Sequence, residues 1–123
     1  MKILIAEDSA TIRRLVATRL TADGYDVVEA ADGEEALDLA RSNRPDLLIL
    51  DKVMPKLDGF EVVRALREDP ATSALPIVML TGQTSEADVL GGLGLGVEEY
   101  MPKPFSPREL SARVRRTLDR AAR

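Results

Sequence analysis

Short apolar runs alternate with helix-like segments along the whole chain. The runs occupy residues 3–6, 25–30, 46–50, 77–80 and, more weakly, 97–101. Their length suits strands, and their near-continuous apolar character is typical of strands covered on both faces. Strands that alternate with helices form βαβ units around a parallel sheet. The chain has 123 residues without a linker, repeat or low-complexity tract, so we predict one α/β domain over residues 1–123.

Capping patterns mark the starts of the predicted helices. Asp32 and Asp58 each precede a glutamate by three residues, and Ser106 does the same with Pro107 at the first helical position. These are capping-box patterns that satisfy the first backbone donors of a helix. The segment 11–22 shows instead an apolar stripe that we expect to be buried. The stripe consists of Ile12, Leu15, Val16 and Leu20.

A glycine cluster interrupts a predicted fourth helix, which Ser85 would cap. Its members are Gly91, Gly92, Gly94 and Gly96. Each glycine inside a helix costs about 1 kcal/mol relative to alanine. One interpretation is a short helix followed by a loose loop, which this cost favours. The other is a soft segment that serves a conformational change.

Acidic residues follow two of the apolar runs. Glu7 and Asp8 come after the run 3–6, and Asp51 comes directly after the run 46–50. The carboxyl ends of parallel strands meet at one edge of the sheet, where sites in this class of fold form. Carboxylates gathered there repel by about 4 kcal/mol per pair at ~4 Å and an effective dielectric near 20. The pattern therefore predicts that a cation belongs in this cluster.

Composition excludes several classes of function. The chain contains no cysteine and no histidine, which removes disulfides, thiolate chemistry, imidazole metal sites and Ser-His-Asp catalysis. No apolar stretch approaches the length of a membrane span, and the N-terminus lacks a signal-peptide pattern. These features predict a cytoplasmic protein without membrane contact.

The net charge of −4 is unlike the basic footprint of a nucleic-acid binder, so we expect no direct contact with nucleic acid. One basic group stands out near the C-terminus. It is either a solvated helix face or a docking patch for an acidic partner. Its members are Arg113, Arg115, Arg116 and Arg120.

Four stretches of the chain together resemble one family. They are Ala6-Glu7-Asp8-Ser9, then Leu50-Asp51 with Met54-Pro55 and Asp58-Gly59, then Thr81, and finally Lys103-Pro104-Phe105. In this order and at these strand ends they resemble the response-regulator receiver domain, the CheY-like family, over essentially the whole chain. The resemblance implies a flavodoxin-like, doubly wound, five-stranded parallel sheet in the order 2-1-3-4-5 with five helices in three layers. That order would place Asp8 and Asp51 side by side.

The resemblance also implies a role for each site residue. Asp51 would be the phosphoacceptor, a carboxylate nucleophile that forms an acyl phosphate. Mg²⁺ would be bound by Asp8, Asp51 and the backbone carbonyl of Val53, with Glu7 holding a metal-bound water. Lys103 would contact the phosphoryl oxygens, and its bond to Pro104 would be cis, as it is in the family.

Two further residues would form the switch. Thr81 would donate its hydroxyl to the phosphoryl group, and Tyr100 would respond to the movement of Thr81. Each site residue also has a plainer interpretation. Asp8 would be a helix cap, Thr81 a strand-end threonine, Lys103 a surface lysine and Tyr100 an interface residue, while for Asp58 capping is the main expectation.

The implied function is a phosphoacceptor receiver in a two-component phosphorelay. A histidine kinase or histidine phosphotransfer protein would supply the phosphoryl group. The surface of the fourth helix, fifth strand and last helix would then act on a protein target or a covalently linked output domain. We expect a monomer or a weak, phosphorylation-dependent dimer that catalyses only its own phosphorylation and slow dephosphorylation. Slow hydrolysis is expected because Val53 and Gln83 hold positions linked to dephosphorylation in the family.

The alternative is a Mg²⁺-dependent phosphatase with an aspartyl-phosphate intermediate. Such an enzyme would share the nucleophile, the metal, the threonine and the lysine. It typically carries a second aspartate two residues after the nucleophile as general acid, and Val53 stands there. The alternative is therefore the weaker of the two.

Overall fold

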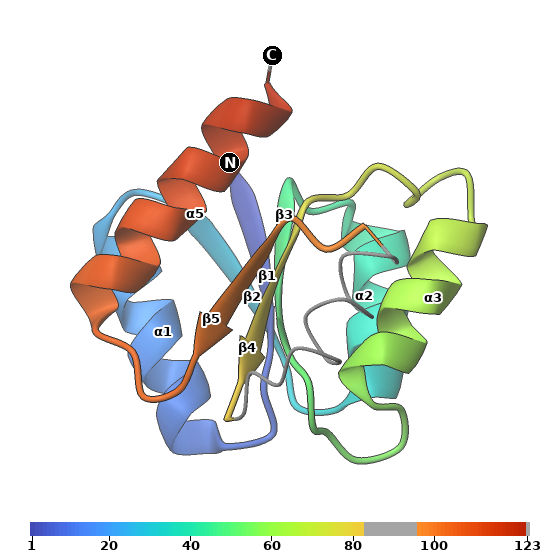
Figure 1. The fold of residues 1–123 in the computed structure, drawn as a ribbon, viewed down its shortest axis with the longest axis horizontal. Helices are drawn as coiled ribbons and strands as arrows, with labels where there is room; N and C mark the ends of the chain where they lie inside the picture. The colour runs from blue at the N-terminus through green and yellow to red at the C-terminus, as the bar shows by residue number, and fades with distance from the viewer. Residues whose placement is uncertain (83–95, 123) are drawn as a thin grey trace.

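Five parallel strands form one sheet within residues 1–82 and 96–122, which the computed structural model describes. Their order is β2-β1-β3-β4-β5. The N-terminus and the end of the last helix lie on the side of the sheet where the strands begin, opposite to the arrowheads (Figure 1). The predicted order and direction are confirmed. The strands are β1 (Lys2–Ala6), β2 (Asp26–Ala30), β3 (Leu47–Asp51), β4 (Ile77–Thr81) and β5 (Glu99–Pro102).

Helices cover both faces of the sheet (Figure 1). The helices α1 (Ala10–Ala22) and α5 (Pro107–Ala121) lie on one face, and α2 (Gly33–Asn43) and α3 (Gly59–Glu68) lie on the other. None of these described helices is both long and apolar enough to span a membrane. The predicted fourth helix, with Ser85 and most of the glycine cluster, falls outside the described residues.

The two layers explain why the strands are apolar throughout. Successive side chains of a strand point to opposite faces. In β1, Leu4 packs in the core beneath α2 and α3, while Ile3 and Ile5 pack in the core beneath α1 and α5. In β3, Leu48 and Ile49 divide in the same way. Both faces therefore require apolar residues.

The predicted helix starts are confirmed at three positions. Asp32 accepts a hydrogen bond from the backbone N–H of Glu35 at 2.8 Å. Asp58 and Glu61 form a complete capping box with bonds of 2.9 and 3.1 Å. Ser106 accepts from the N–H three residues later at 3.0 Å, with proline at the first helical position.

The prediction that Leu15 is buried was wrong, since Leu15 is 52% exposed. The buried residues of α1 are Val16, Ala17 and Leu20. At 3.6 residues per turn, these three share one arc, and Leu15 lies on the far flank of Val16. Ala17 occupies the position on the other side of this arc, within the core beneath α1 and α5.

Strand boundaries differ from the prediction by one or two residues. The third strand ends at Asp51 itself and not before it. The cause is a continued ladder, because the N–H of Lys52 donates to the carbonyl of Leu80 at 2.9 Å. Asp51 therefore sits on rigid backbone.

Candidate functional site

Three carboxylates converge at the carboxyl ends of β1 and β3. Glu7 and Asp8 follow β1, and Asp51 ends β3. The two strands are parallel neighbours, with Ala6 opposite Leu50, so the groups that follow come together. One oxygen from each of the three carboxylates lies within 4.8 Å of the others. Asp8 and Asp51 are thus side by side, as the strand order implies.

Lys103 joins the two buried carboxylates of this cluster. Its ammonium Nζ lies 2.9 Å from Glu7 Oε2 and 3.0 Å from Asp51 Oδ2. Glu7 is 1% exposed and Asp51 5% exposed, while Asp8 is open to solvent. An ammonium between two buried carboxylates offsets their mutual repulsion. Lys103 therefore supplies part of the positive charge that the acidic cluster requires.

A backbone hydrogen bond fixes the position of the Lys103 main chain. Its N–H donates to the carbonyl of Thr81 at 2.7 Å, which ties the loop after β5 to the end of β4. The Lys103–Pro104 peptide bond is cis, as the resemblance implied. The lysine thus reaches the carboxylates from an anchored position.

Burial and charge shift the pKa values of two groups. Burial raises the pKa of Glu7 from 4.5 to about 7, and the charge of Asp51 adds to this, while the bonds from Lys103 and the Ser9 N–H oppose it. For Lys103, burial alone would lower the pKa, but its bonds to Glu7 and Asp51 raise the pKa above the usual value. Lys103 is therefore a permanent cation here, while Glu7 can hold a proton near neutral pH.

The loop after Asp51 is held by close backbone packing. The N–H of Gly59 donates to the carbonyl of Lys52 at 2.7 Å. A Cβ atom at Gly59 would lie 2.7 Å from the Asp51 carbonyl oxygen and 2.8 Å from Lys52 Cα. Only glycine fits at this approach. Val53 is 72% exposed, and its backbone N–H donates to Asp51 Oδ1 with an N–O distance of 3.4 Å.

The predicted switch residues occupy β4 and β5. Thr81 ends β4 and is 2% exposed, one strand away from Asp51. Tyr100 pairs with Met79 across the β4–β5 ladder. It is half-buried and packs against the core beneath α2 and α3. Thr81 thus borders the acidic cluster, whereas Tyr100 begins further back along the sheet.

Comparison with known proteins decides the family. The protein family described as "Response regulator receiver domain" matches residues 3–115 of this chain. The chain belongs to this family. The assignment makes it a receiver domain, a phosphoacceptor of two-component signalling, and nothing in the comparisons supports the phosphatase alternative.

Individual proteins agree with this assignment. The receiver is 50% identical over 119 residues to "Probable transcriptional regulator ycf27" of Porphyridium aerugineum, covering 97% of this chain and 48% of that protein. It is 48% identical over 120 residues to "Alkaline phosphatase synthesis transcriptional regulatory protein PhoP" of Bacillus subtilis (strain 168), covering 98% and 48%. The chain therefore spans about half the length of these relatives. The structure of Vibrio cholerae chemotaxis protein CheY4 matches with a TM-score of 0.90 and 40% identity, covering 94% of this chain and 97% of that one.

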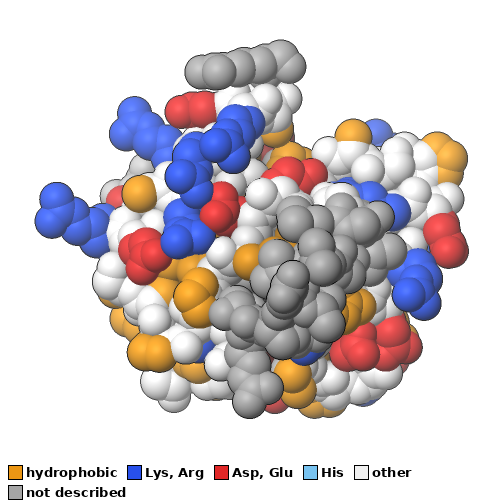
Figure 2. All heavy atoms as spheres, viewed as in Figure 1, with side chains coloured by type: hydrophobic (Ala, Val, Ile, Leu, Met, Phe, Trp, Pro, Cys, Tyr) orange, Lys and Arg blue, Asp and Glu red, His pale blue; other side chains and the backbone are white. Residues whose placement is uncertain are grey.

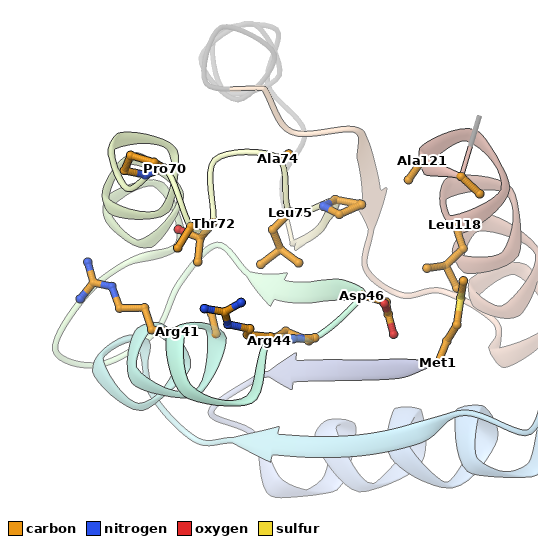
Figure 3. Close-up of a pocket in the computed structure, with 15 residues that line it drawn as sticks. Met1, Arg41, Arg44, Asp46, Pro70, Thr72, Ala74, Leu75, Leu118 and Ala121 are labelled. Carbon is orange, nitrogen blue, oxygen red and sulfur yellow. The ribbon is translucent and has the colours of Figure 1, made fainter.

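A groove of about 420 Å³ lies at the other end of the receiver. Figure 3 shows Met1, Asp46, Leu75 and Leu118 around it, with Arg44 at the end of α2. These residues lie at or near the amino ends of the strands, and the three carboxylates lie at the carboxyl ends. The groove is therefore separate from the acidic cluster.

The arginines near the C-terminus are partly paired within the receiver. Arg113 and Arg116 each bind one oxygen of Glu99, at 2.8 and 2.7 Å, and Arg113 also binds Glu109 at 2.9 Å. Figure 2 shows acidic side chains among the basic ones in the region of α5. This pairing favours the interpretation as a solvated face over that of a docking patch.

Sequence reasoning missed Arg13. Its Nη1 donates to the backbone carbonyl of Glu7 at 2.8 Å, and its Nε donates to Glu29 at 3.1 Å. The available signal was a basic residue one turn into the helix that follows Glu7 and Asp8. Arginines are frequent on helix surfaces, so this signal was weak.

Proposed function

We propose that Asp51 is the phosphoacceptor of this receiver. The donor is a phosphohistidine of a histidine kinase or of a phosphotransfer protein. A carboxylate oxygen of Asp51 bonds to phosphorus while the P–N bond of the donor breaks, which leaves an acyl phosphate. The observation that carries the proposal is the Lys103 ammonium, 3.0 Å from Asp51 and 2.9 Å from Glu7. Such a fixed cation suits a reaction that depends on positioning and on charge neutralisation.

The acidic cluster fits a magnesium ion. It offers only oxygen ligands, the kind that Mg²⁺ prefers, and their separations suit a single ion. Asp8 and Asp51 bind it directly in this proposal, the carbonyl of Val53 completes the protein ligands, and Glu7 holds a metal-bound water. Bound Mg²⁺ supplies neutralisation of the charge on the transferred group.

The protein's own residues then hold the product. Formation of the acyl phosphate removes the charge of the Asp51 carboxylate, and the phosphoryl oxygens replace it as partners of Lys103. Thr81 donates its hydroxyl to a second phosphoryl oxygen. The phosphoryl group brings about two negative charges and three acceptors to this edge of the sheet.

In this proposal Thr81 moves inward to make its bond to the phosphoryl group. The movement gives Tyr100 room to move, which changes the surface around β5 and α5. Moving a 1:99 mixture of two states to 99:1 needs about 5.5 kcal/mol. Hydrogen bonds to charged groups contribute about 1.5–3 kcal/mol each. Contacts from Thr81 and Lys103 supply an effect of this size.

We infer that residues 1–123 act as a single receiver domain within the cytoplasm. The two relatives described above are named as transcriptional regulators, so the output is proposed to be control of transcription. It passes through a protein target or a covalently linked output domain, without direct contact between the receiver and nucleic acid. The receiver is proposed to be a monomer or a weak, phosphorylation-dependent dimer.

Intact mass spectrometry tests this function directly. The wild type is treated with a small phosphodonor, with Mg²⁺ or with a chelator. We expect one added phosphoryl group that requires Mg²⁺, and none in Asp51→Asn. The control is Asp38→Asn, which changes an exposed carboxylate of α2 and should leave the modification intact. Equal modification of wild type and Asp51→Asn would overturn the assignment.

A further inference from the structure

Arg13 connects the acidic cluster to a neighbouring strand. It lies in α1, and its guanidinium bridges the Glu7 carbonyl at 2.8 Å and the Glu29 carboxylate of β2 at 3.1 Å. Its side chain is 17% exposed, whereas that of the next residue, Arg14, is 77% exposed and lies 3.6 Å from the same glutamate. The two adjacent arginines therefore share a partner, but within residues 1–82 and 96–122 Arg13 alone of the two also bonds to the backbone of the site.

Glu7 is held on every side. Its N–H donates to the carbonyl of Ala30 at 3.1 Å, and its carbonyl accepts from Arg13. One carboxylate oxygen accepts from the N–H of Ser9 at 3.2 Å, and the other accepts from Lys103 at 2.9 Å. These bonds fix the backbone on both sides of the intervening residue, Asp8.

Asp8 depends on this backbone for its direction. Its carboxylate is open to solvent and makes no hydrogen bond or ion pair with the described part of the chain. The backbone sets the direction of its Cα–Cβ bond, and the side chain then occupies one of a few staggered rotamers. The hold on the Glu7 carbonyl therefore limits which Asp8 rotamers bring the carboxylate towards Asp51.

We propose that Arg13 is a positioning residue for the metal site. This inference rests on the proposed function, since it concerns how well Asp8 and Asp51 share one cation. Arginine suits the role because its planar fork carries donors for the carbonyl and for Glu29 at once. The compact ammonium of lysine keeps the charge without this fixed two-point geometry.

Charge and position make opposite predictions, which allows a decisive experiment. If Arg13 acted only through its charge, its removal would make the cluster more negative and Mg²⁺ would bind more tightly. If Arg13 positions the backbone of Glu7 and Asp8, its removal weakens Mg²⁺ binding. Arg13→Ala tests the sign, and Arg13→Lys keeps the charge while removing the geometry.

Mg²⁺ affinity is measured by isothermal titration calorimetry on the wild type, both Arg13 variants and Arg14→Ala. Loss of an outer partner of a metal ligand typically weakens binding roughly 10- to 100-fold, and we expect this for both Arg13 variants. Arg14→Ala is the matched control, and its exposed pair should matter little. Wild-type affinity in Arg13→Lys, or tighter binding in Arg13→Ala, overturns the proposal.

Two variants separate the possible failures. Arg13→Lys keeps the charge and most of the side-chain length, so weaker Mg²⁺ binding in this variant supports positioning even where Arg13→Ala folds poorly. Asp8→Asn tests the metal site itself. Equal Mg²⁺ binding by the wild type and Asp8→Asn would defeat the proposed function and not merely the role of Arg13.

Discussion

The metal-free receiver should lose stability as the pH rises towards neutrality, because Glu7 ionises where it is buried. The pKa of Glu7 is raised from 4.5 to about 7, so the folded protein holds this proton more tightly than the unfolded chain. The contribution is fully present below pH 4.5 and is lost as the pH rises through about 7. At about 1.4 kcal/mol per pH unit, the loss approaches about 3 kcal/mol.

Glu7→Gln isolates this contribution, since glutamine stays neutral at every pH. The free energy of unfolding is measured by urea titration with a chelator between about pH 5 and about pH 8. We expect the difference in stability between Glu7→Gln and wild type to shift in favour of the variant by about 2.5 kcal/mol across this range. Glu68→Gln, which changes an exposed glutamate of α3, serves as control.

Parallel stability curves for the wild type and Glu7→Gln would refute the reasoning. Saturating Mg²⁺ provides a second arm. A cation bound by the cluster favours ionised carboxylates, so it should flatten the wild-type curve. If the free energy of unfolding of the wild type depends on pH equally with and without Mg²⁺, the ionisation of Glu7 is not coupled to metal binding.

Two further predictions concern the loop after Asp51, the proposed phosphoacceptor. Gly59→Ala should lower the free energy of unfolding by about 1–3 kcal/mol and slow phosphorylation, because the new Cβ overlaps backbone at Asp51. Gly82→Ala, whose Cβ would meet nothing within 4 Å, is the stability control in urea titrations, and equal effects would contradict the packing argument. Val53→Asn should speed hydrolysis of the acyl phosphate, because an amide can orient water where valine cannot. An unchanged decay of the phosphorylated mass would exclude this role for Val53.

The arrangement of the sheet could be predicted because its causes are local and repetitive. Apolar runs specify strands covered on both faces, and carboxylates directly after two runs must reach the same edge. The caps at Asp32, Asp58 and Ser106 could be read in the same way, since each bond spans three residues. Leu15 could not be placed correctly, because a short apolar stripe does not reveal which of its flanks the sheet will cover.

Side-chain partnerships in the site were less predictable. The sequence suggested Glu7 only as a holder of metal-bound water, yet in the structure it is also a direct partner of Lys103 at 2.9 Å. That distance depends on the path of the loop after β5, which no local pattern specifies. Arg13 was missed for a related reason, since its partner is a backbone carbonyl and carbonyls carry no sequence signal.

The lysine bridge also joins residues that are far apart in the order of synthesis. Lys103 lies 96 residues from Glu7 and 52 from Asp51 along the chain. A ribosome therefore releases both carboxylates long before their ammonium partner emerges. Fragments that stop short of Lys103 carry both carboxylates without this ammonium. Under the proposed function they lack the cation that would contact the phosphoryl group, so we expect them not to hold one.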